Sequence, residues 1–259
     1  MPAQRMIDMN ADVGESFGAY RIGSDAALLK IISSANVACG FHAGDPAIMA
    51  QTCEAAAAQG VAVGAHPGYP DLQGFGRRAM TLSADEIEAV VAYQVGALQA
   101  IAARAGTRVA HVKAHGALYN AAERDRDVAD AIARSVRSVD ESLILVAAAG
   151  SAMAEAADRH GLRFAGEGFP DRTYDDDGHL LSRALPDSVI HDPVLAAENA
   201  RRMAIEGTVE TIGGRKIKAD IRTLCVHGDV PGAVSIASAI RAMLESKGVS
   251  VVPLPTLFH

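Results

Sequence analysis

Residues 35–65 read ANVACGFHAGDPAIMAQTCEAAAAQGVAVGA, and this stretch contains one complete β-α-β unit. The apolar runs 35–38 and 61–65 have the length of buried strands. Between them, Asp45 and Pro46 supply an N-cap and a proline at the first helical position, and Gly60 ends the helix. A glycine that leads directly into the next strand is typical of repeated strand-helix units around a parallel sheet.

The same rhythm continues through the chain on both sides of this unit. Further short apolar runs predict strands at 6–7, 108–113, 143–147, 162–165, 222–227 and 249–252. Punctuated helices are predicted from the capping box at Ser83, over 151–160, from Asp192-Pro193, and from Asp229 and Pro231. We therefore predict an α/β fold with a closed β/α barrel, and an open doubly wound sheet is the alternative.

Two segments interrupt the rhythm without dividing the chain. Residues 168–190 are polar and rich in turn formers, and residues 208–218 predict a hairpin around Gly213 and Gly214. Both read as insertions, so residues 1–259 are expected to form a single barrel domain. A length of 259 residues suits one such barrel, which typically has about 250.

The composition excludes several classes of function. The net charge is −7 and no basic stripe is present, which argues against nucleic acid and against adhesion to anionic membranes. The three cysteines include no CxxC pair, which fits a reducing, cytoplasmic compartment. We expect no secretory signal, because residues 1–5 lead into no hydrophobic signal region. The longest apolar runs, such as 143–149, are too short to span a bilayer.

Polar side chains gather where the predicted strands end. The carboxyl ends of parallel barrel strands open onto one face, where barrel enzymes place their sites. We therefore predict one shared active site there. Its candidate residues are Asn10, Asp12, Glu15, His42, His66, Arg77, Lys113, His115, Asn120, Glu167, Arg172 and His227.

Several of these residues have a structural interpretation as well. Asn10 and Asp12 could instead close a turn through side-chain bonds to the backbone. Lys113 needs a partner if buried, either an ion pair with Asp12 or Glu15 or an anionic substrate group. His111 lies inside a strand and is interpreted as structural. Cys39 and Cys225 are interpreted as buried thiols rather than nucleophiles.

Metal and phosphate motifs give weaker indications. Asp12, His42 and His66 could meet and bind a divalent transition metal, but no HxH or HExxH spacing supports them, and we assign no metal ligand. No GxxxxGK[ST] or strand-linked GxGxxG sequence is present. The segment 74–78, G-F-G-R-R, could bind an anion or form a plain turn.

Six segments together resemble the LamB/YcsF family, in family order and over nearly the whole chain. Two positions depart from the usual family pattern, Ala114 and Pro170, where the family usually has proline and alanine. Both changes affect loop stiffness rather than polar groups. The matching segments are NADVGE (10–15), NVACGFHAGDP (36–46), AHPGYPDLQGFGRR (65–78), HGALYN (115–120), DRTY (171–174) and CVHGD (225–229).

The resemblance implies an irregular seven-stranded barrel related to the glycoside hydrolase/deacetylase barrels. It implies ATP-dependent opening of 5-oxo-L-proline to L-glutamate, as the A component of a 5-oxoprolinase that also has B and C subunits. ATP is then a co-substrate, and the missing phosphate-loop sequence places its site largely on the partners. The resemblance leaves open whether a divalent metal is also a cofactor.

Roles follow from the chemistry of a stable five-membered lactam. We expect Arg77 or Lys113 to bind the substrate carboxylate or a phosphate, and Asp12 or His66 to act as general base. Charge stabilisation is expected from His42, His115 and His227. Two alternatives are a stand-alone metal-dependent hydrolase or deacetylase, with Asp12, His42 and His66 as ligands, and a non-catalytic subunit that delivers substrate.

Overall fold

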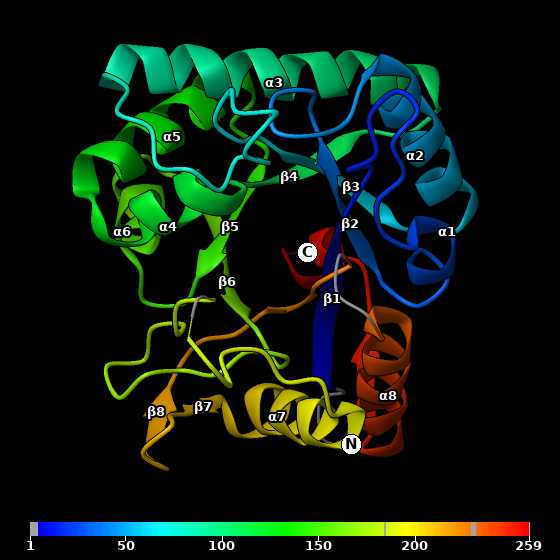
Figure 1. Ribbon diagram of the computed structural model, residues 1–259, viewed down its shortest axis with the longest axis vertical. Helices are drawn as coiled ribbons and strands as arrows, with labels where there is room; N and C mark the ends of the chain where they lie inside the picture. Colours follow the sequence, from blue (N-terminus) through cyan, green and yellow to red (C-terminus); the bar gives the residue numbers. More distant parts are fainter. Residues whose placement is uncertain (1–4, 184, 229–231, 259) are drawn as a thin grey trace.

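A ring of parallel strands forms the centre of the computed structural model, which describes residues 5–183, 185–228 and 232–258 (Figure 1). Its pairing order is β1-β2-β3-β4-β5-β6-β9, and β9 pairs back with β1. This closure confirms the predicted barrel with seven strands and rules out an open sheet. The strands are β1 (Arg5–Val13), β2 (Ser34–Ala38), β3 (Ala62–His66), β4 (Val109–Lys113), β5 (Ile144–Ala148), β6 (Arg163–Gly168) and β9 (Thr223–Val226).

The barrel is irregular because β1 serves different partners along its length. Arg5 to Ile7 pair with β10 (Val249–Val251), whereas Asp8 to Ala11 pair with β9. The predicted last strand therefore forms but lies outside the closed ring. The predicted first strand, 6–7, was too short, because the polar residues after it continue the strand to Val13.

Helices cover the outside of the ring (Figure 1). Asp45 accepts hydrogen bonds from the N–H groups of Ala47 and Ile48, and Ser83 forms a capping box with Glu86, as predicted. The predicted residues Asp229 and Pro231 lie outside the described part of the chain. The predicted helices are α2 (Pro46–Ala58), α3 (Ala84–Arg104), α6 (Ala152–Arg159), α7 (Pro193–Glu206) and α8 (Ala233–Ser246).

Three helices were not predicted: α1 (Asp25–Leu28), α4 (Gly116–Arg124) and α5 (Arg126–Val139). The second of these follows β4 directly, and it turns the segment 116–120 into a helix rather than a loop. In the described residues no helix combines the length and the apolar character needed to cross a membrane.

The apolar core lies between the strands and the helices. Side chains alternate along a strand, and Ile7, Met9, Ala11 and Val13 of β1 form one buried apolar row. They pack with apolar helix residues such as Leu98.

The inward row of β1 is polar and consists of Asp8, Asn10 and Asp12. Asp8 is fully buried and accepts hydrogen bonds from the hydroxyls of Ser33 (2.7 Å), Ser34 (2.6 Å) and Thr223 (2.5 Å). These bonds satisfy most of the acceptor capacity of the carboxylate inside the barrel.

The other strands continue this polar interior. Gly64 of β3 leaves room for the ring of His111, which a Cβ at position 64 would overlap. Nε2 of His111 lies 2.8 Å from the Asn36 oxygen, which agrees with its predicted structural role. On the side of β1 to β4 the barrel interior is therefore a hydrogen-bonded column rather than a stack of apolar layers.

A small apolar plug fills the barrel interior near β5. Val146 lies in register with Lys113 and faces inward with Ile144, two residues earlier. Both pack with Ala165 and with Leu254 of the 3-10 helix η1 (Leu254–Phe258). In Figure 1 η1, drawn in red, accordingly lies near the middle of the ring.

The two predicted insertions lie together at one side of the barrel. The hairpin is confirmed as the antiparallel pair β7 (Thr208–Glu210) and β8 (Lys216–Lys218). Asp176 of the segment 169–192 accepts hydrogen bonds from the hydroxyl of Thr211 (2.7 Å) and the N–H of Gly213 (3.1 Å). These bonds hold the long loop against the hairpin.

The buried carboxyl group of Asp8 should make the stability of the folded protein depend on pH. Burial raises its pKa from 3.8 to about 6, and its three hydroxyl partners oppose that change. The folded protein keeps this proton to a higher pH than the unfolded chain does, so stability is lost as pH rises from about 4 to about 6. Between pH 4 and pH 6, we expect the free energy of unfolding of Asp8→Asn to rise by about 3 kcal/mol relative to that of the wild type. Urea unfolding of both proteins at pH 4 and pH 7 measures this difference. If the two free energies of unfolding change with pH in parallel, the prediction is contradicted.

Candidate active site

A cavity of about 720 Å³ opens at the carboxyl ends of the strands, bordered by the loop 169–192. It is the place at which the sequence predicted a site. Three predicted residues, Asn10, His42 and Glu167, are buried behind its wall rather than lining it. The predicted residues that do line it are Asp12, Glu15, His66, Arg77, Lys113, His115, Asn120, Arg172 and His227.

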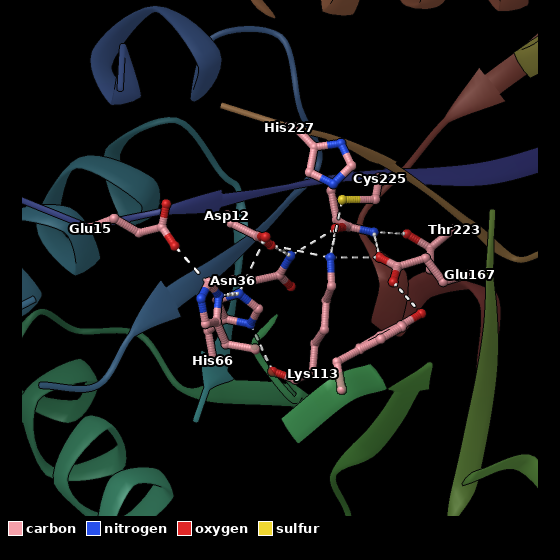
Figure 2. A network of polar contacts seen from close by, with 12 residues as sticks. Asp12, Glu15, Asn36, His66, Lys113, Glu167, Thr223, Cys225 and His227 are labelled. Atoms are coloured by element: carbon pink, nitrogen blue, oxygen red, sulfur yellow. Dashed lines mark hydrogen bonds and ion pairs between the residues drawn. The ribbon is translucent and has the colours of Figure 1, made fainter. Parts of the chain in front are cut away.

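Lys113 is the central cation of the cavity wall. Its Nζ lies 3.1 Å from Asp12 Oδ1 and 2.9 Å from Glu167 Oε1 (Figure 2). Its side chain is 4% exposed. Burial would lower the pKa of Lys113, but the negative charges of Asp12 and Glu167 outweigh burial and raise it well above 10.5. Lys113 is therefore charged at neutral pH, with Asp12 and Glu167 as partners rather than Glu15.

Asp12 lies between the lysine and the imidazoles. Its Oδ1 accepts a hydrogen bond from Asn36 (2.9 Å), and its Oδ2 lies 3.3 Å from His66 Nε2. Burial would raise the pKa of Asp12, but His66 and Lys113 lower it well below 3.8. Asp12 is thus an ionised carboxylate, 17% exposed to the cavity. Turn closure by Asn10 and Asp12 is not what the structure shows, because both bond side chains across the barrel.

Glu167 joins this network from the opposite side. It accepts hydrogen bonds from Asn10 Nδ2 (3.0 Å) and from the Tyr119 hydroxyl (3.0 Å). The sequence prediction missed Tyr119 and Asn36. The available signal for Asn36 was a polar residue inside an apolar strand. Tyr119 could not be placed at the site without α4, the helix that carries it, and that helix was not predicted.

Three imidazoles, His42, His66 and His115, form a cluster beside Asp12. The rings of His42 and His115 stack in parallel with 3.7 Å between their centroids, and His66 meets both edge-on. Glu15 reaches them from the end of β1, with Oε1 3.4 Å from His42 Nε2 and 3.6 Å from His115 Nδ1. Burial lowers the pKa of His115 to about 3 and that of His42 well below 6.5.

Two glycines of the loop after β3 allow the imidazoles to pack this closely. A Cβ at Gly76, whose φ is +62°, would lie 2.7 Å from Cβ of His42 and 2.8 Å from Cδ2 of His115. A Cβ at Gly68 would lie 2.8 Å from His42 Nδ1. A side chain at either position would push the stack apart.

His227 faces the cavity from the end of β9. Its Nδ1 lies 2.8 Å from Oδ2 of the buried Asp171, and its ring stacks on Phe169 at 5.8 Å. Burial would raise the pKa of Asp171, but the contacts with His227 outweigh burial and lower it. The ionised carboxylate therefore fixes a proton on Nδ1 and leaves Nε2 for the cavity.

The remaining predicted residues differ in what they can do. Arg77 is exposed at the cavity and lies 5.0 Å over the Phe75 ring, and Asn120 is exposed on α4. Arg172 instead donates to the backbone carbonyls of Ser188 (2.9 Å) and Leu181 (2.6 Å), which orders the loop that borders the cavity.

In the segment 74–78, Arg77 faces the cavity, but the N–H of Gly74 and the guanidinium of Arg78 do not present an open anion site. Asp71 accepts hydrogen bonds from the N–H of Gly74 (3.0 Å) and from the guanidinium of Arg78. An internal carboxylate thus occupies the position that an external anion would need, and the plain-turn interpretation fits better.

The donor atoms that could hold a metal differ from the set considered in the sequence. One ligand atom from each of Glu15, His42, His66 and His115 lies within 4.8 Å of the others. Asp12 is not in this group, because Lys113 and Asn36 hold one of its oxygens on the other side of the network.

Comparisons with known proteins agree with this geometry. The sequence model of the LamB/YcsF family matches residues 7–259. A protein of Rhodopseudomonas palustris (strain BisB5), named as the A subunit of 5-oxoprolinase, is 52% identical over 248 residues, covering 95% of this chain and 98% of that protein. One of the same name from Heliobacterium modesticaldum is 53% identical over 245 residues, covering 95% and 96%.

Solved structures extend the likeness to the fold. The lactam utilization protein of Thermus thermophilus superposes with a TM-score of 0.91 at 48% identity, covering 95% of this chain and 99% of that one. The structure described as T48 deacetylase with substrate gives a TM-score of 0.53 at 14% identity, covering 98% and 91%. The latter likeness concerns the barrel fold alone.

Proposed function

The chain belongs to the LamB/YcsF family, and we propose that it is the A subunit of an ATP-dependent 5-oxoprolinase, which opens 5-oxo-L-proline to L-glutamate. The observation that carries this proposal is the match of 52–53% identity over nearly the whole length of relatives with that name. A hydrolase role also suits the cavity, because it combines a buried cation, an ionised carboxylate and imidazoles.

The cavity residues suit the chemistry of lactam hydrolysis. A lactam resists water until its carbonyl is polarised and a water is deprotonated beside it. We assign the first task to Lys113, which is charged and preorganised at the wall, and the second to Asp12. The exposed Arg77 would bind the substrate carboxylate, since a guanidinium matches a carboxylate in two-point geometry.

His227 is assigned to the leaving nitrogen. Opening the ring requires a proton on that nitrogen. The Nε2 of His227 would first take up a proton at the cavity and then pass it to the leaving nitrogen, while Asp171 holds the other proton on Nδ1. His66 was an alternative general base, but its Nδ1 is engaged by the Lys113 carbonyl and its Nε2 already faces Asp12 and His115. Asp12 is therefore preferred as the base.

ATP and the partner subunits complete the proposal. ATP would serve as co-substrate that activates the lactam, bound largely by the B and C subunits in a cytoplasmic complex. A stand-alone metal-dependent hydrolase is the second candidate, favoured by the convergence of Glu15 with three imidazoles.

A reconstitution assay tests the proposal. With B and C subunits, ATP and 5-oxo-L-proline, we expect glutamate release only when this chain is present. Release that is equal without the chain would refute a catalytic role. Turnover by the isolated chain without ATP would favour the stand-alone hydrolase instead.

A further inference from the structure

We propose that the cavity wall contains a binding site for one divalent transition-metal ion of the Zn²⁺ or Co²⁺ class, formed by Glu15, His42, His66 and His115. Such a site would bind metal whether or not 5-oxo-L-proline is the substrate. Two features of the imidazole cluster lead to it: the protonation states that the backbone imposes on its rings, and the distances between its donor atoms.

The backbone fixes the tautomers of two rings. Nδ1 of His66 lies 2.7 Å from the carbonyl oxygen of Lys113, and Nε2 of His115 lies 2.8 Å from that of Phe75. A carbonyl oxygen only accepts, so both of these nitrogens carry hydrogen. In neutral rings, His66 Nε2 and His115 Nδ1 are then lone pairs, and they face each other at 3.0 Å. Two lone pairs at that distance repel unless a cation lies between or beside them.

His42 distinguishes a metal ion from a single shared proton. It is fully buried, and neither of its ring nitrogens has a hydrogen-bond partner among the described residues. A proton shared by His66 and His115 would leave His42 unsatisfied, which is costly inside a protein. A metal ion that also accepts a lone pair from His42 Nε2 removes this cost, and the carboxylate of Glu15 supplies compensating charge.

Three of the donor spacings are near those around a four-coordinate ion, and all four donor atoms lie within 4.8 Å of one another. Ligands about 2.0–2.1 Å from a tetrahedral Zn²⁺ lie about 3.4 Å from one another. Glu15 Oε1 lies 3.4 Å from His42 Nε2 and 3.6 Å from His115 Nδ1. Three imidazoles and one carboxylate are donors typical of this class of metal.

The surroundings have the form that metal ligands usually have. The outer nitrogens of His66 and His115 are held by carbonyls, which orients their inner nitrogens toward the centre. Gly68 and Gly76 lie directly against the rings of His42 and His115, where a Cβ at either position would clash. An ion bound here would supply Lewis acidity beside Asp12, at the wall that the substrate would face.

Metal titration of the purified full-length chain tests the site. After chelator treatment, Zn²⁺ and Co²⁺ are added, and bound metal is measured by mass spectrometry and by the visible absorption of Co²⁺. The variants are Glu15→Gln and His42→Gln, with circular dichroism as a check of folding. The matched control is His160→Gln. Nε2 of His160 lies 3.0 Å from Asp130 Oδ1, and neither residue lines the cavity.

We expect about one equivalent of metal per wild-type chain and a rise in Tm on metal addition. Each ligand variant should bind at least about 10-fold more weakly, whereas His160→Gln should bind like the wild type. Binding below about 0.1 equivalent in the wild type would overturn the site. So would unchanged affinity in a folded Glu15→Gln variant, which also covers the case in which His42→Gln fails to fold.

Discussion

Replacing Lys113 by methionine is expected to lower ATP-dependent glutamate release by about 10³-fold and to destabilise the fold by about 3–5 kcal/mol. Methionine keeps the length of the side chain but leaves Asp12 and Glu167 without their buried cation. Turnover in the reconstitution assay and urea unfolding of the isolated chain measure the two effects.

Two further variants separate stability from chemistry at this position. Adding Glu167→Gln to Lys113→Met removes one unpaired carboxylate, so stability should recover while turnover stays low. Lys216→Met is the matched surface control, since Lys216 pairs with Glu206 at 3.1 Å with its side chain 54% exposed. That pair should contribute less than about 1 kcal/mol. Near-normal turnover in folded Lys113→Met would remove the role assigned to Lys113.

The change Asp12→Asn is expected to reduce kcat by about 10²–10⁴-fold in the folded variant. It should also lower the stability, because Lys113 loses one of its two carboxylate partners. The amide oxygen can still accept from Lys113 and Asn36, but it cannot take a proton from water. Steady-state kinetics of the reconstituted enzyme measure this, and the loss should fall on kcat rather than on KM.

The control for Asp12 is a carboxylate-to-amide change elsewhere. Asp45→Asn keeps a competent N-cap on α2 and should leave turnover unchanged. Metal content should stay as in the wild type for both variants, because neither residue belongs to the imidazole cluster. If Asp12→Asn turns over normally, the general base must be sought elsewhere in the cavity.

The fold could be predicted well from local patterns. Apolar runs, the N-caps at Asp45 and Ser83, and the glycine after each predicted helix are short-range signals, and the strands and most helices followed them. The sequence also indicated the face of the barrel at which the cavity and most of the candidate residues lie. Helix α4 was missed because the segment 116–120 was interpreted as part of the loop after a strand.

The partners within the site could not be predicted in the same way. The sequence offered Asp12 or Glu15 for Lys113, and the structure adds Glu167, which is 54 residues later in the chain (167 − 113). Glu15 instead meets His42 and His115. The direction of the strands tells at which end of the barrel the polar side chains lie. The stagger between neighbouring strands decides which of those side chains lie at the same level along the barrel axis and can meet.

The sequence by itself determined the alternation of strands and helices and the end of the strands at which the polar residues gather, because both follow from periodicity and caps within a few residues. The pairing of β9 with β1 closed the barrel and excluded the open sheet, and only the structure showed it. Only the tertiary structure decided that Asp8, Asn10 and Asp12 point inward from one strand, that His42 is buried behind the cavity, and that Glu15 joins three imidazoles. Those outcomes depend on ring closure and on side-chain packing between distant segments, which no local pattern specifies.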